Sequence, residues 1–123
     1  MAENSRDIGH GFREVARSQV NPPGHFEALG HFVFVYFKDE KLCKCGQSDV
    51  AISPNGAYAI FTDVSSGRLM LFTSASGTRK ELTEAFVGYP KTASWDLAAK
   101  RAVVTLEEYD NGEGSIHTLT VRL

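Results

Sequence analysis

The amino-acid sequence predicts a mainly β protein, with two antiparallel sheets of the meander type and one short N-terminal helix. Three observations lead to this fold class. Residues 49–83 contain four short segments rich in β-branched, aromatic and long aliphatic residues, which are typical of strands. Turn-forming clusters at residues 53–56, 65–67 and 76–77 separate these segments. A similar pattern begins again near Trp95, so the chain contains a second, incomplete copy of the unit.

Length and composition set limits on the class of protein. A chain of 123 residues, 42% of them hydrophobic, has the size of one domain and can bury a single core. A formal net charge of −2 gives no strong overall field to attract nucleic acid or an anionic membrane. No apolar stretch reaches the roughly 18 residues of a membrane-spanning helix, and residues 1–15 lack the apolar core of a signal peptide. We expect a soluble, cytoplasmic protein.

We treat the chain as one domain of four segments, namely residues 1–24 for the N-terminal helix and linker, 25–48 for a hairpin, 49–87 for the first unit and 88–123 for the second. In the first segment, residues 1–10 are polar and are expected to be loosely packed. From Phe12, apolar residues recur close to helical spacing, which predicts a short amphipathic helix. This helix ends before Pro22, because a proline disfavours helical geometry in the residue that precedes it.

The second segment contains the most apolar run of the chain. Residues 32–37 have the sequence FVFVYF and predict a strand with both faces covered. Residues 38–41 form a polar turn, after which the chain returns as a paired strand or continues as a surface loop. In an extended strand, Cys43 and Cys45 would point to one face but lie too far apart to bridge easily. We therefore expect reduced thiols.

Between the two units, Gly88 and Pro90 predict an irregular crossing, with Phe86, Val87 and Tyr89 packed on the core. Strand alternation gives our candidate core residues, which are Phe32, Phe34, Ile52, Ile60, Leu69, Leu71, Trp95, Val103, Leu106 and Leu119.

The second unit aligns with the first when Trp95 is set beside Ile52. Residues 102–105 then lie beside residues 59–62, at an offset of 43 residues. This period is close to the roughly 40 to 45 residues of a four-stranded propeller blade.

Residues 49–59, with their Ser-Pro-Asn-Gly turn, resemble the turn between the first two strands of β-propeller repeats of the WD40 and TolB kind. The resemblance covers residues 49–121 and implies two blade-like sheets, either in a small stand-alone protein, which we favour, or in an assembly of several chains. In the second unit, residues 97–100 replace the Pro-Asn-Gly turn. The chain is also shorter than a closed propeller, which takes about four blades or more.

One segment is a candidate binding site. Residues 107–114, EEYDNGEG, place four acidic residues around one tyrosine in what we expect to be the longest hairpin loop of the two units. The alternatives are a solvated loop and, with less support from the residue spacing, a calcium site. As a binding site, the segment would suit a basic protein surface. The candidate partner-binding residues are Glu107, Glu108, Tyr109, Asp110 and Glu113.

The sequence contains no Gly-x-Ser-x-Gly elbow and no glycine-rich phosphate loop, so we expect neither enzyme activity nor a cofactor. We predict a protein-binding protein, monomeric or homodimeric, that resembles bacterial immunity proteins in type. Such proteins bind and neutralise a cognate toxin, often a basic one. Two alternatives stay open. One is a small-ligand or metal-binding protein or enzyme with a site at Cys43, Cys45 and His31, and the other is an oligomerising β scaffold with exposed edge strands.

Overall fold

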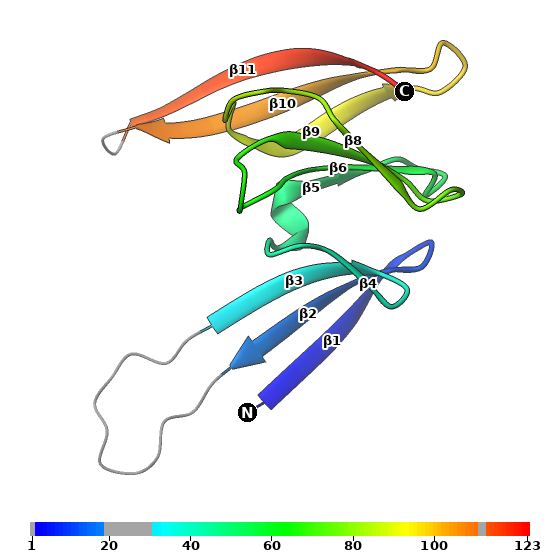
Figure 1. Cartoon of the computed structure of the whole chain (residues 1–123), viewed down its shortest axis with the longest axis vertical. Helices are drawn as coiled ribbons and strands as arrows, with labels where there is room; N and C mark the ends of the chain where they lie inside the picture. The colour runs from blue at the N-terminus through cyan, green and yellow to red at the C-terminus, as the bar shows by residue number, and fades with distance from the viewer. Residues whose placement is uncertain (1, 19–30, 111–112) are drawn as a thin grey trace.

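The computed structural model describes residues 2–18, 31–110 and 113–123, and it confirms the mainly β fold class (Figure 1). The described residues form three antiparallel sheets rather than two, and a single turn of 3-10 helix, η1 (Gln47–Asp49), precedes the second sheet. Among these residues, no helix has the length and hydrophobicity needed to cross a bilayer. The strands are β1 (Ala2–Gly9), β2 (Phe12–Ser18), β3 (His31–Phe37), β4 (Glu40–Cys43), β5 (Val50–Ile52), β6 (Tyr58–Thr62), β7 (Leu69–Thr73), β8 (Thr78–Glu81), β9 (Tyr89–Asp96), β10 (Arg101–Asp110) and β11 (Glu113–Arg122).

The first sheet contains β1 to β4 in sequential order, so the predicted N-terminal helix was wrong. Phe12 and Val15 are both fully buried, which produced the apparent helical spacing. They lie on opposite faces of β2, because they are three positions apart on a strand whose side chains alternate between the two faces. A strand that buries one residue on each face can place apolar residues three apart and so imitate a helix.

Of the two hairpins at the ends of the first sheet, the sequence predicted the second and not the first. The polar N-terminal residues, expected to be loosely packed, pair along β2 as strand β1. Their turn passes through Gly9, His10 and Gly11, all with positive φ, a conformation that glycine adopts without steric penalty. The β3–β4 hairpin confirms the predicted strand, polar turn and returning strand.

The central sheet contains β5 to β8 in sequential order and confirms the predicted meander. Its first turn is closed by a hydrogen bond from the Gly56 N–H to the Ser53 carbonyl oxygen, 2.9 Å long. The Ser53 hydroxyl also accepts the Tyr58 N–H at 3.0 Å. Gly56 has a φ of 72°, and a Cβ at this position would overlap the His10 side chain. The turn is therefore packed against the first hairpin of the neighbouring sheet.

The third sheet has the order β11-β10-β9. β10 pairs with β11 along its whole length, from Arg101 opposite Arg122 to Asp110 opposite Glu113. Pairing between β10 and β9 stops at Glu107. Beyond that residue the hairpin continues as two strands and projects past β9 and the strands of the central sheet (Figure 1).

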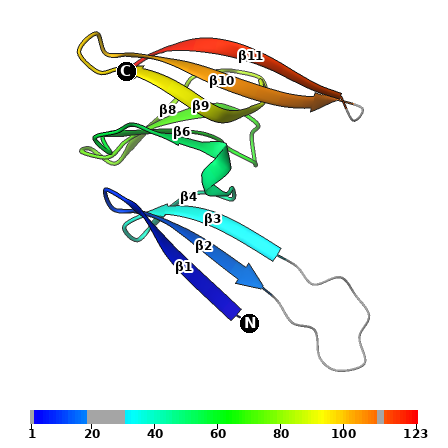
Figure 2. The same ribbon diagram turned by 180° about the vertical axis from the view of Figure 1, so that it is seen from behind.

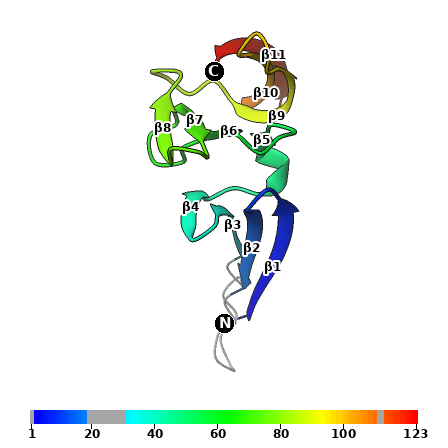
Figure 3. The same cartoon turned by 90° about the vertical axis from the view of Figure 1, so that its right-hand side faces the viewer.

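The three sheets are stacked, with the central sheet between the other two, as Figure 2 shows from behind and Figure 3 from the side. Alternation along β7 directs Leu69 and Leu71 to the third sheet and Met70 and Phe72 to the first. Because both faces of β7 are covered, its sequence is a continuous apolar run. On the side of the first sheet, the ring of Phe37 lies 5.3 Å from that of Phe72, measured between centroids.

The candidate core residues are mostly confirmed. Ile60, Leu69, Leu71 and Leu106 are buried, while Ile52, Trp95 and Leu119 are partly buried against the core. Phe34 is half-buried, and the side chain of Phe32 lies outside the described residues. Val103 was wrong, because its side chain is 40% exposed and that of Val104 is fully buried. A shift of one residue exchanges the two faces of a strand.

Arg79 on β8 joins the central sheet to the first. Its guanidinium donates hydrogen bonds to the carbonyl oxygens of Lys41, at 2.8 Å, and Leu42, at 3.2 Å. It also forms an ion pair with Glu40 at 3.3 Å and lies over the ring of Phe61. This single side chain therefore attaches β4 to the neighbouring sheet.

Candidate protein-binding site

The predicted partner-binding residues lie together at one end of the β10–β11 hairpin. They are Glu107, Glu108, Tyr109 and Asp110 at the end of β10 and Glu113 at the start of β11. The predicted loop over residues 107–114 was too long, because strand pairing continues to Asp110 opposite Glu113. Residues 111–112 lie outside the described residues. We call residues 108–110 and 113–115 the arm, because they pair with each other beyond the last residue of β10 that pairs with β9.

The carboxylates of this region lie on two faces. Glu107 and Glu108 are consecutive strand residues, so their side chains point to opposite faces of the hairpin. Glu107 lies on the outer face of the third sheet, the face turned away from the central sheet, together with exposed Val103. Glu113 shares the face of Glu108, since its partner Asp110 is two residues further along β10. The side chains of Tyr109 and Asp110 lie outside the described residues.

Exposed apolar side chains surround Glu107. In the strand register, Glu107 lies between Tyr89 on β9 and Ile116 on β11. Tyr89 is 36% exposed and Ile116 is 71% exposed. Phe86, 42% exposed, packs edge to face against Tyr89 with ring centroids 5.4 Å apart. We call Phe86, Tyr89, Glu107 and Ile116 the outer patch. Phe86 and Tyr89 were expected in the core, which is wrong, whereas Val87 is packed against it.

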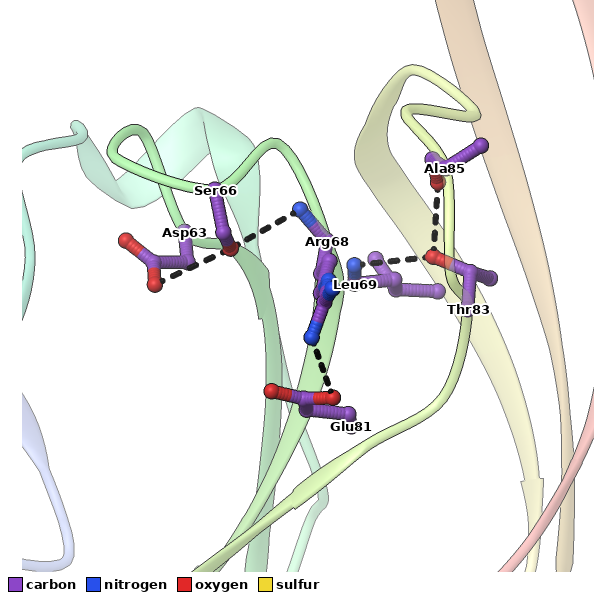
Figure 4. A network of polar contacts seen from close by, with 7 residues as sticks. All are labelled: Asp63, Ser66, Arg68, Leu69, Glu81, Thr83 and Ala85. Atoms are coloured by element: carbon purple, nitrogen blue, oxygen red, sulfur yellow. Dashed lines mark hydrogen bonds and ion pairs between the residues drawn. The ribbon is translucent and has the colours of Figure 1, made fainter.

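Two hydrogen bonds of the Thr83 hydroxyl hold the segment that carries Phe86. The Thr83 hydroxyl accepts the Leu69 N–H at 3.1 Å and donates to the Ala85 carbonyl oxygen at 2.9 Å (Figure 4). Close by in the same view, Arg68 forms an ion pair with Glu81 at 2.7 Å, which links β8 to the start of β7. The main chain before the outer patch is therefore attached to the central sheet.

Gly88 places the outer patch against β10. Its φ is 105°, and a Cβ on this residue would lie 2.7 Å from the carbonyl oxygen of Glu107. The Gly88 carbonyl oxygen accepts a buried hydrogen bond of 2.8 Å from the Thr62 hydroxyl. Only glycine allows this close approach in this conformation. The contact fixes Tyr89 beside Glu107.

The two cysteines form a disulfide, so the expectation of reduced thiols was wrong. β4 ends at Cys43, and the chain bends at the next residue instead of continuing extended. The two Cα atoms are consequently 5.3 Å apart, within the usual range for a disulfide. A site built from two thiolates with His31 is thereby lost, and the side chain of His31 lies outside the described residues. Among the described residues, no three His, Cys, Asp or Glu side chains are grouped so as to hold a metal ion.

The sequence analysis missed three members of the outer patch. Ile116 was detectable, because alternation counted back from buried Val121 places it on the solvent face. Tyr89 and Phe86 gave no such signal. Their exposure depends on the path of the chain around Gly88, which is set by tertiary contacts.

A scan against protein-family models and searches of curated proteins and of solved structures find no match to this chain.

Proposed function

We propose that this chain is a non-catalytic protein-binding protein that holds a basic protein partner, as an immunity protein holds its toxin. One observation carries the proposal. The projecting β10–β11 hairpin carries Glu107 and exposed Ile116 on one face, beside exposed Tyr89 of β9 and Phe86. Two further carboxylates, Glu108 and Glu113, lie on its other face. The stacking of three meanders supports the likeness to propeller blades and supplies a rigid frame for this hairpin.

The composition of the outer patch suits an interface core. Aromatic residues dominate binding energy at interfaces because they bury a large area with few rotatable bonds. Glu107 lies between Tyr89 and Ile116, so a lysine or arginine of the partner would be bound in an apolar surrounding. Removal of one partner of such a pair is costly, because the other charge is left desolvated and without its counter-charge.

The arm contributes to the rate of association. Its carboxylates project from the molecule on paired strands, where they attract a positively charged surface before contact. Strand pairing also limits the conformational entropy that is lost on binding. We therefore expect the arm to affect mainly the association rate and the outer patch to affect mainly the dissociation rate.

The test begins with capture of the partner from the native host and purification of the protein that is recovered. Its affinity is then measured for Ile116→Thr and Glu107→Gln, with Val64→Thr and Asp39→Asn as controls. The controls remove an exposed apolar group or a carboxylate elsewhere on the surface. We expect losses of about tenfold or more for the two patch variants, which corresponds to about 1.4 kcal/mol each.

Three results bear on the proposal. A basic partner whose toxicity in cells is suppressed by co-expression of this chain would support it. Equal losses for patch and control variants would refute the location of the site. Recovery of no basic protein from the host would refute the class of partner.

A second candidate function is an oligomerising β scaffold, which one observation favours. β11 is a ten-residue strand at the edge of the third sheet in the described part of the chain. Long edge strands can pair with other chains. Static light scattering tests this directly, since a scaffold requires a mass that rises with protein concentration, and a constant monomer mass would exclude it.

A further inference from the structure

The end of the third sheet opposite the arm carries a concentration of positive charge. Arg101 and Arg122 lie directly opposite each other on β10 and β11, and Lys100 precedes them in the β9–β10 turn. Like charges in directly paired positions repel. Asp96 lies 3.8 Å from Arg101 and compensates one of these charges. Within the part of the chain that the structure describes, Lys100 and Arg122 form no ion pair.

The three cations line a hollow in the surface. The hollow has a volume of about 480 Å³, and its remaining lining residues are Ala99, Thr120 and Leu123. A second hollow of about 320 Å³ adjoins it and shares Arg101 and Thr120. Both volumes fall at the lower end of the range of roughly 300 to 1,000 Å³ for small-molecule sites. We call Lys100, Arg101, Thr120 and Arg122 the cationic corner.

The main chain of the cationic corner is held by several hydrogen bonds. In the β9–β10 turn, the Asp96 carboxylate accepts the Ala99 N–H at 3.1 Å. The Leu123 N–H donates to the Lys100 carbonyl oxygen at 2.9 Å, which connects the turn to the end of β11. Arg101 and Arg122 are fixed relative to each other by strand pairing. The main-chain positions of the three cationic residues are therefore fixed without a bound ligand.

We propose that the cationic corner binds an oxyanion group, a phosphate or carboxylate carried by a small molecule. A guanidinium group donates two parallel hydrogen bonds to such a group, and the Thr120 hydroxyl can donate a third. The negative charge relieves the repulsion between Arg101 and Arg122. Asp96 disfavours an anion on its own side of Arg101, so the oxyanion lies nearer to Lys100 and Arg122. This site does not depend on the proposed protein partner.

The test is a titration of the isotope-labelled chain with inorganic phosphate, followed by NMR at constant ionic strength. We expect saturable shifts in the amide signals of Lys100, Thr120 and Leu123. Arg122→Gln should weaken phosphate binding about tenfold or more, as loss of a charge-assisted hydrogen-bonded pair does. Thr120→Val should weaken it less and keeps the shape and strand preference of the side chain.

Lys80→Gln is the matched control, because it removes the same charge from an exposed position on β8. Succinate replaces phosphate in a parallel titration, and tighter binding of one probe identifies the oxyanion as phosphate or carboxylate. Shifts that rise linearly without saturation would overturn the proposal. So would equal weakening by Lys80→Gln and Arg122→Gln, because that result indicates general attraction of anions to positive charge.

Discussion

Replacement of Gly88 by alanine should destabilise the protein strongly. The new Cβ would lie 2.7 Å from the Glu107 carbonyl oxygen and 2.9 Å from the Glu107 carbonyl carbon. Both are main-chain atoms of β10, so no side-chain rotation can relieve the overlap. Either the β8–β9 connection or the strand has to move. Movement of the connection would also break the buried hydrogen bond from Thr62 to Gly88.

Two contributions determine how much Gly88→Ala lowers the free energy of unfolding. A φ of 105° lies in a region that residues with a side chain rarely adopt, and occupying it costs about 1–3 kcal/mol. Forcing an added carbon into packed surroundings costs about 1–3 kcal/mol more. The sum, about 2–6 kcal/mol, is a large part of the roughly 5–15 kcal/mol by which domains are stable. For a chain of this length we expect the melting temperature to fall by about 8–23 °C.

Gly9→Ala supplies the control. Gly9 has a φ of 110°, almost equal to that of Gly88, and no atom lies within 4 Å of a Cβ built on it. Gly9→Ala should therefore lower the free energy of unfolding by the conformational contribution alone, about 1–3 kcal/mol. Urea and thermal unfolding, followed by circular dichroism, measure both variants. If Gly88→Ala destabilises the chain no more than Gly9→Ala does, the described contact between the β8–β9 connection and β10 is refuted.

Three further predictions concern the frame. Thr62→Val should lower the free energy of unfolding by about 1–3 kcal/mol in urea titrations, because it leaves the buried Gly88 carbonyl oxygen without its donor. Arg79→Gln should lower the free energy of unfolding by about 1–2 kcal/mol, because it removes hydrogen bonds between two sheets. Arg68→Gln removes an exposed ion pair and should lower it by about 0.5 kcal/mol or less. Equal losses would contradict the role of Arg79 between the sheets. When the unfolded, unreduced chain is alkylated, mass spectrometry should find no label on either cysteine. Reduction of the Cys43–Cys45 disulfide should lower the free energy of unfolding by about 1–2 kcal/mol. This loss is small because the loop that the disulfide closes is short.

The central sheet was predictable because its signals are local. Each of its turns carries its own cluster of glycine, serine, asparagine or proline, as in the turn closed between Ser53 and Gly56. The first sheet was partly misread for an equally specific reason. Burial of Phe12 on one face and Val15 on the other gives a spacing that periodicity alone cannot distinguish from a helix.

The candidate site was also predictable only in part. The position of the acidic residues at a hairpin end followed from the sequence, and their division between two faces follows from alternation once the strands are known to continue. The aromatic part of the outer patch was not predictable. Tyr89 and Phe86 have the composition of core residues, and their exposure depends on the packing of Gly88 against Glu107, a contact between residues distant in sequence.

The two proposed sites lie on opposite ends of one hairpin, which makes their tests independent. Arg101 and Glu107 are six positions apart on β10, a distance of about 20 Å at the usual rise per strand residue. The Debye length at physiological ionic strength is about 8 Å, so charge at one site is largely screened at the other. Effects of distant substitutions are then additive. Arg122→Gln should leave the affinity for a protein partner unchanged, and Glu107→Gln should leave the affinity for phosphate unchanged. A loss of both activities in either variant would show that the two ends of the hairpin are coupled through a change in fold.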